Sequence, residues 1–171
     1  MSRPIKVRGC LLAFCAVCLC LRAEVRVGDP FPSLNALDPV GVELPARAGK
    51  VILVDFWASW CAPCKESFSS YAQLQTEYRS RGLVIVAVSV DEKQSAFEAF
   101  VKRFNPPFVV LRDRGQQLVR KVSVPAMPTC YLLGRDGRVR FVHQGFRGVE
   151  TDRAIRQETD LLLAENTSSH E

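Results

Sequence analysis

The feature that most constrains this 171-residue chain is a pair of cysteines, Cys61 and Cys64, that follows closely on a run of apolar residues, Val51–Phe56. Four consecutive aliphatic residues are typical of a strand that is buried on both faces, and such strands belong to parallel sheets. The residues after Cys61 have helical periodicity. We therefore predict that the pair lies where a central strand is followed by a helix.

This placement favours redox chemistry. The two-residue spacer allows Cys61 and Cys64 to close a short disulfide, and a helix start places Cys61 beside unpaired backbone N–H groups and the positive end of the helix dipole. A free cysteine titrates near pH ~8.5, and pairs in this setting are lowered towards ~7 or below. Cys61 is therefore the expected nucleophile, with a substantial thiolate population at neutral pH.

Residues 1–23 have the pattern of an export signal. Arg3, Lys6 and Arg8 precede a 12-residue apolar run, Cys10–Leu21, which is short for a membrane span. Cleavage after Ala23 is one expectation; an uncleaved anchor through residues 9–22 and lipid attachment are its alternatives. Removing residues 1–23 takes away four basic residues, so the formal charge falls from +5 to +1. No basic stripe with interleaved aromatic residues remains, and nucleic-acid binding is not expected.

Residues 24–165 predict one domain, and residues 166–171 a polar tail. Proline-rich residues 28–50 predict a hairpin that covers a sheet edge. The elements expected after Val51–Phe56 are a helix from Cys61 to Gly82, strand Leu83–Val90, helix Ser95–Phe104, strand Phe108–Leu111, a helical turn at Gln116–Val122, a hairpin of Thr129–Leu133 and Arg138–Gly145, and a helix containing Ile155 and Leu162. This order predicts an α/β fold with a mixed sheet flanked by helices.

At this level the chain resembles the thioredoxin superfamily and, within it, the exported TlpA/ResA-like thiol-disulfide oxidoreductases. The resemblance covers nearly all of residues 28–164, and its most specific segments are Val54–Lys65, Val124–Thr129 and Leu132–Gly137. It implies a thioredoxin fold with an N-terminal β-hairpin and an inserted helix and strand between Asp91 and Leu111.

The resemblance also implies a set of site residues. Cys61 and Cys64 would form the redox-active disulfide, with Cys61 attacking a client disulfide and Cys64 resolving the mixed disulfide. Asp55 occupies the place of the family's buried acid, so it would accept the proton of Cys64, although a purely structural carboxylate is the alternative. Pro128 would be a cis proline that faces the cysteines. The expected substrate contacts are Trp60, Ala62, Pro63, Met127 and Pro128.

The chain departs from the family pattern at three places. Ser67 stands where many relatives have a glutamate, Ser69 where many have a helix-kinking proline, and Ala87 where thioredoxin has the lysine that pairs with the buried acid. Any acid function therefore falls on Asp55, and the helix is expected to be straighter. Cys130 is expected to be a buried inert thiol, with a third redox thiol as the alternative.

The leading hypothesis is an exported, periplasmic disulfide reductase that acts on oxidised client proteins and draws electrons from a membrane-bound donor. It needs no cofactor or metal and is expected to act as a monomer. A disulfide oxidase or isomerase would use the same residues at a different potential. An alternative of another class is a copper or zinc carrier that binds the metal through Cys61 and Cys64, with His143 or Cys130 as a further ligand.

Overall fold

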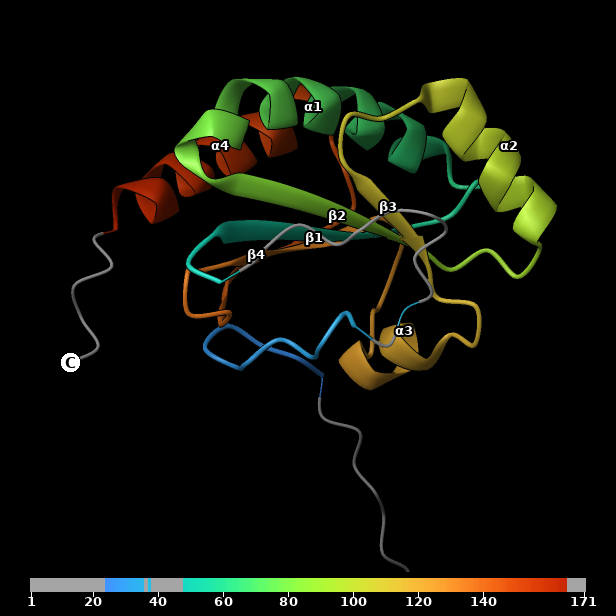
Figure 1. Cartoon of the computed structure of the whole chain (residues 1–171), viewed down its shortest axis with the longest axis horizontal. Helices are drawn as coiled ribbons and strands as arrows, with labels where there is room; N and C mark the ends of the chain where they lie inside the picture. The colour runs from blue at the N-terminus through green and yellow to red at the C-terminus, as the bar shows by residue number, and fades with distance from the viewer. Residues whose placement is uncertain (1–23, 36, 38–47, 166–171) are drawn as a thin grey trace, which may run out of the picture.

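The computed structural model describes residues 24–35, 37 and 48–165 (Figure 1). The export signal or anchor predicted in residues 1–23 and the polar tail of residues 166–171 lie outside this description. So does most of the predicted N-terminal hairpin, which includes residues 36 and 38–47. In the described part of that segment, Pro30 forms an isolated antiparallel bridge with Arg138.

Five strands form one mixed sheet in the order β3-β2-β1-β4-β5. Their bounds are β1 Val51–Trp57, β2 Leu83–Ser89, β3 Val109–Arg112, β4 Thr129–Leu133 and β5 Val139–Gln144. Strand β2 is parallel to β1 and β3, whereas β4 is antiparallel to β1 and β5. Every residue of the central strand β1 is buried, as its continuous apolar run predicts. The predicted mixed sheet is confirmed.

The helices cover the sheet unequally (Figure 1). Helices α1 (Ala62–Tyr78), α2 (Gln94–Phe104) and α4 (Val149–Ala164) lie above it in this view, and the short α3 (Gln117–Val122) lies below. Helix α1 runs without interruption through Ser69 and passes into a short 3-10 turn, η1 (Arg79–Arg81), which ends at Gly82 with φ 105°. In the described part of the chain, no helix is both long and apolar enough to cross a bilayer.

The inserted helix and strand, α2 and β3, are attached to the rest of the protein in two ways. Strand β3 pairs with β2 and becomes the edge of the sheet. Helix α2 contributes Phe97 and Phe100 to an aromatic cluster with Trp57 and Phe68. The Phe100 ring lies 4.3 Å from the Trp57 ring and 5.0 Å from the Phe68 ring, centroid to centroid. The insertion therefore packs directly behind the strand end that leads to Cys61.

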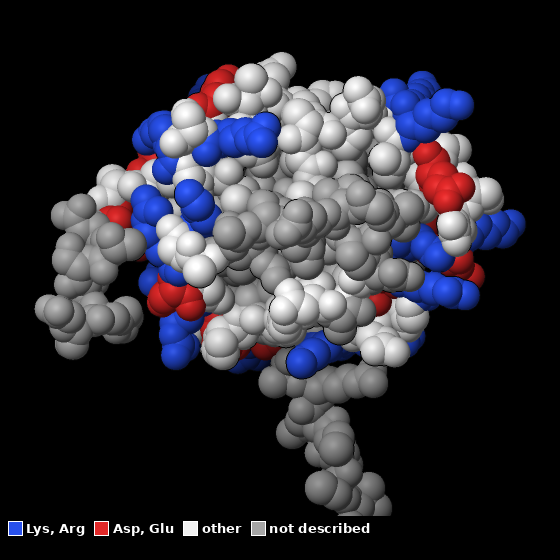
Figure 2. Space-filling view, in the orientation of Figure 1, with Lys and Arg blue, Asp and Glu red and all other residues white. Residues whose placement is uncertain are grey.

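The charged side chains of the visible face are mixed in sign. Figure 2 shows lysine and arginine side chains around the rim with aspartate and glutamate between them. The described residues on this face do not form one continuous basic stripe.

Truncation of Phe100 tests the role of the aromatic cluster. Phe100→Ala is expected to lower the free energy of unfolding by about 3–5 kcal/mol, because the lost ring leaves a cavity between α1 and α2. Leu161→Ala is the control, since Leu161 is 62% exposed on α4, and it should change stability by no more than about 0.5 kcal/mol. Urea unfolding measures both variants, and equal losses would show that the cluster is not a principal contact of α2.

Candidate active site

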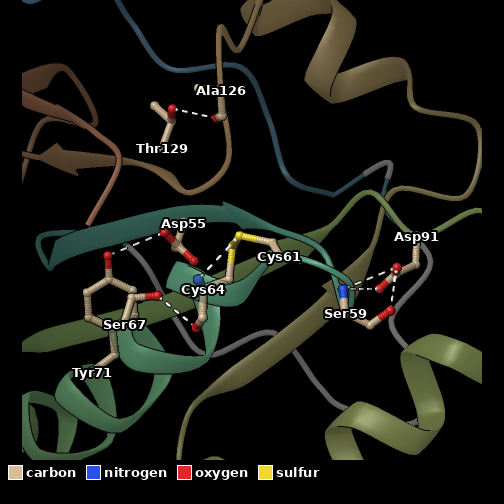
Figure 3. The surroundings of a disulfide bond; sticks show 9 residues. All are labelled: Asp55, Ser59, Cys61, Cys64, Ser67, Tyr71, Asp91, Ala126 and Thr129. Atoms are coloured by element: carbon tan, nitrogen blue, oxygen red, sulfur yellow. Dashed lines mark hydrogen bonds between the residues drawn. A yellow bond between two sulfur atoms is a disulfide. The ribbon is translucent and has the colours of Figure 1, made fainter. Parts of the chain in front are cut away.

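The two cysteines lie at the N-terminus of α1, where the sequence predicts them. Cys61 is the N-cap residue of α1 and is joined to Cys64 by a disulfide, with the two Cα atoms 5.3 Å apart (Figure 3). The Cys64 backbone N–H donates to the Cys61 sulfur at 3.2 Å. Cys61 retains 5% exposure, whereas Cys64 has none. Cys61 is therefore the more accessible of the two sulfurs, and it lies at the positive end of the helix dipole.

Residues on either side of Cys61 form its exposed surroundings. Trp60 is 71% exposed, and Ala62 and Pro63 are also exposed. Met127 is half-buried and Pro128 is buried, and the peptide bond between them is cis. These two residues immediately precede β4, which begins opposite Phe56 at the end of β1. The register thus brings Met127 and Pro128 to the end of the sheet at which the chain leaves β1 and continues to Cys61.

A buried carboxylate fixes the segment before Trp60. Asp91, only 4% exposed, accepts hydrogen bonds from the Ser59 backbone N–H at 3.0 and 3.2 Å and from the Ser59 hydroxyl at 2.8 Å (Figure 3). The Ser89 hydroxyl donates to the same carboxylate at 2.8 Å. Because Ser89 is the last residue of β2, these bonds fasten the segment that carries Trp60 and Cys61 to the sheet. Sequence reasoning did not identify Asp91.

Asp55 is completely buried in the middle of the sheet. Its register neighbours are Ala87 on β2 and Cys130 on β4. One carboxylate oxygen, Oδ1, accepts a hydrogen bond from the Tyr71 hydroxyl at 3.3 Å, and the other, Oδ2, has no partner among the described residues (Figure 3). Burial raises the pKa of Asp55 well above its usual value, and the bond from Tyr71 opposes this shift. In the described structure no lysine, arginine or histidine forms an ion pair with Asp55.

Comparison with known proteins identifies the family. The Redoxin family profile matches residues 26–157. The chain belongs to the Redoxin family. It is 32% identical to the thiol-disulfide oxidoreductase ResA of Bacillus subtilis (strain 168) over 149 residues, which cover 86% of this chain and 82% of that protein. A ResA of Bacillus cereus is 31% identical over 120 residues, 69% of each chain.

Solved structures agree with this family. A crystal structure from Chlorobium tepidum, described as a putative thiol:disulfide interchange protein DsbE, superposes with a TM-score of 0.77 and 35% sequence identity, over 82% of this chain and all of that one. The resemblance to the thioredoxin superfamily and its TlpA/ResA-like members is thereby confirmed. This Redoxin-family protein is a thiol-disulfide oxidoreductase with a Cys-x-x-Cys pair at a helix N-terminus.

The departures from the family pattern have visible structural consequences. Ser67 is buried and its hydroxyl donates to the Cys64 carbonyl at 3.0 Å, so it bonds within α1 and brings no charge to the site. Glu66, the adjacent acid, is exposed. Ala87 lies opposite Asp55 on β2, so this register position brings no charge to the carboxylate. Among the residues that the structure describes, Asp55 is therefore the buried acid beside the cysteines (Figure 3).

Two further candidate residues, Cys130 and His143, lie on neighbouring strands of the sheet. Cys130 is a buried free thiol, and burial raises its pKa, which favours the neutral form. His143 Nε2 lies 2.6 Å from Glu158 Oε2, a partner on α4 that the sequence did not reveal. Among the described residues, no group of three or more histidine, cysteine, aspartate or glutamate side chains has the arrangement of a metal site.

The raised pKa of Asp55 makes a prediction for stability. Because the folded pKa exceeds the unfolded one, wild-type stability should fall as pH rises through the folded value, where a buried charge must form. Asp55→Asn should remove this fall, so the variant should be the more stable protein at alkaline pH, with the smallest difference in acid. Urea unfolding at a series of pH values measures both curves.

Asp136→Asn supplies a control of opposite sign. Burial alone would raise the pKa of Asp136, but bonds from the Arg138 backbone and the Arg140 side chain lower it overall. Asp136→Asn should therefore lose stability at neutral pH, and the loss should shrink as pH falls through the lowered pKa. Parallel curves for wild type and Asp55→Asn would contradict the assignment of Asp55 as a group with a raised pKa.

Proposed function

We propose that this protein is an extracytoplasmic disulfide reductase that transfers electrons from a membrane-bound donor to oxidised client proteins. The observation that carries the proposal is that a sulfur at a helix N-terminus and an unpaired buried carboxyl group occur in the same site. The sulfur belongs to Cys61, the N-cap residue of α1. The carboxyl group belongs to Asp55, which among the described residues has one oxygen without a hydrogen bond and no counter-ion. The first group is suited to nucleophilic attack, and the second is suited to accept a proton.

The reaction has two exchange steps. In the first, the Cys61 thiolate attacks a sulfur of the client disulfide, a Cys61–client bond forms, and one client thiolate leaves. In the second, the Cys64 thiolate attacks the Cys61 sulfur, which restores the Cys61–Cys64 disulfide and releases the second client thiolate. Two electrons pass from the cysteine pair to the client. A donor dithiol must then reduce Cys61–Cys64 for the next cycle.

Asp55 serves the second step in this proposal. Cys64 is completely buried, so its thiol needs an internal group to take its proton. Oδ2 of Asp55 is buried and unpartnered among the described residues, and a raised pKa suits a base that works near neutral pH. When a donor reduces the disulfide, the protonated carboxyl group can return the proton to the leaving Cys64 sulfur.

The surroundings of the two sulfurs support a reducing direction, because few groups stabilise a thiolate there. A cysteine pair becomes a strong oxidant when its reduced form is strongly stabilised. Here the Cys61 sulfur accepts one backbone N–H, and in the described structure no cationic side chain hydrogen-bonds to either sulfur. An ionised Asp55 would further disfavour a neighbouring thiolate. These features favour the disulfide form and hence a reducing couple.

The client contacts and cellular location are part of the same proposal. A client peptide would lie on a surface formed by residues around Cys61 and residues just before β4. The first group is Trp60, Ala62 and Pro63, which are exposed, and the second is Met127 and Pro128. The basic and apolar pattern of residues 1–23 supports export, with either cleavage or retention as an anchor.

The reduction potential of the Cys61–Cys64 couple tests the direction. Equilibration against defined thiol buffers at neutral pH should give a value at or below about −230 mV. A value above about −180 mV would instead identify a disulfide oxidase or isomerase, because a reductant near about −270 mV and an oxidant near about −120 mV differ by roughly 7 kcal/mol. Cys130→Ser is the control, and its potential should equal that of the wild type.

Single cysteine variants test the order of attack. Cys64→Ser should accumulate a mixed disulfide with an oxidised client, because Cys61 still attacks but nothing resolves the product. Cys61→Ser should form little or none, since Cys64 is inaccessible. Non-reducing electrophoresis after acid quenching measures the trapped species. Equal trapping by the two variants would contradict Cys61 as the attacking residue.

A further inference from the structure

Tyr71 connects the active-site helix to the buried acid. It lies on α1 seven residues after Cys64, which is two helical turns along the same face. Its side chain is 1% exposed, and its hydroxyl donates to Asp55 Oδ1 at 3.3 Å (Figure 3). The edge-on packing of Phe146 against the Tyr71 ring, with centroids 6.2 Å apart, helps to hold the ring in this orientation.

We propose that Tyr71 is a positioning residue for Asp55 and that its hydroxyl extends to lower pH the range in which Asp55 can take the proton of Cys64. This inference rests on the proposed role of Asp55 as the base of the second exchange step. Tyr71 does not touch the client or either sulfur in this scheme. Tyr71 acts by donating a hydrogen bond to Oδ1 of Asp55, which leaves Oδ2 free to accept the proton.

Few other groups in the described structure hydrogen-bond to the Asp55 carboxylate. Among the described residues the Tyr71 hydroxyl is the hydrogen-bond donor to this carboxylate, and no ion pair adds to that bond. A hydrogen bond to the charged form of an acid lowers its pKa, so Tyr71 counteracts part of the effect of burial on Asp55. Burial and the nearby Asp55 charge raise the pKa of Tyr71 itself, so the hydroxyl remains a neutral donor.

The other titratable groups around Asp55 come from neighbouring elements. Cys130 on β4 is its register partner and also interacts with the Tyr71 hydroxyl, but its raised pKa keeps it neutral. Beyond Cys130 lie His143 of β5 and Glu158 of α4, which bond to each other. On β2, Ala87 brings no charge. Tyr71 is thus the group that directly stabilises the Asp55 anion.

The step that Tyr71 supports is a proton transfer. The Cys64 thiol gives its proton to Oδ2 of Asp55, which leaves a Cys64 thiolate and a neutral carboxylic acid. The thiolate then attacks the Cys61 sulfur of the mixed disulfide. Below the pKa of Asp55 the carboxyl group already carries a proton, so the transfer is blocked and the second exchange step slows.

The test compares three variants of the full chain. Reduced protein is mixed with a large excess of oxidised glutathione. The phase whose rate does not depend on the glutathione concentration reports the step in which Cys64 displaces glutathione from Cys61. The rate of this phase is measured from acidic to alkaline pH. Tyr71→Phe removes the hydroxyl that contacts Asp55. Tyr78→Phe is the matched control, because its hydroxyl donates to Asp160 at 3.2 Å from the far end of the same helix. Asp55→Asn removes the base itself.

The rate of this phase should fall at acidic pH, which is the acid limb of its pH profile. Tyr71→Phe is expected to move this limb to higher pH by about 0.5–1 unit, so that the rate on the acidic side is about three- to tenfold lower than in the wild type. Tyr78→Phe should follow the wild-type profile, and Asp55→Asn should be slow with no such limb. Carboxyl carbon NMR of Asp55 in the reduced protein supplies a second measurement, which follows the carboxyl group itself rather than the rate. Its titration midpoint should also rise in Tyr71→Phe.

Two results would overturn the inference in distinguishable ways. If Tyr71→Phe matches the wild type in both measurements while Asp55→Asn loses the limb, Tyr71 has no positioning role and Asp55 remains the base. If Asp55→Asn keeps the limb, the role of Asp55 and the inference built on it are both wrong. The direction of electron transfer is tested separately, by the reduction potential of the wild-type pair.

Discussion

Strand β1 is paired on both edges, with β2 on one side and β4 on the other, and the rest of the site depends on this double pairing. It buries Asp55 between two strands and directs the chain beyond Trp57 towards the start of α1. The same pairing places β4 so that it begins opposite Phe56. The redox disulfide, the buried acid and the Met127–Pro128 segment are therefore all located by one strand.

Two buried carboxylates near this strand, Asp91 and Asp55, have different hydrogen-bonding surroundings. Asp91 has its hydrogen-bonding capacity filled by Ser59 and Ser89, so it acts as a fixed anchor for the segment that carries Trp60 and Cys61. Among the described residues, Asp55 accepts one bond and keeps one oxygen free. A satisfied buried carboxylate rigidifies its surroundings, whereas an unsatisfied one costs stability, and this contrast fits the proposed role of Asp55 as a base.

The insertion of α2 and β3 supports the site without entering it. Its aromatic residues pack on Trp57 and Phe68, the side chains that flank the strand end and the first turns of α1. Because this cluster is dense and apolar, movement of α1 relative to β1 would disrupt several ring contacts at once. A rigid frame of this kind suits the proposed exchange, in which Cys64 must stay close to the Cys61 sulfur while it loses and regains a proton.

The sequence by itself determined the elements and the chemistry of the pair. Apolar runs and helical periodicity located the central strand, the active-site helix, the inserted helix and strand and the final hairpin, because these signals are local in the chain. The spacing of Cys61 and Cys64 is likewise local. Only the tertiary structure decided which side chains from distant segments meet: Tyr71 with Asp55 across 16 residues, Asp91 with Ser59 across 32, and Glu158 with His143 across 15. Such contacts depend on how helices pack on the sheet, and no periodicity along the chain encodes them.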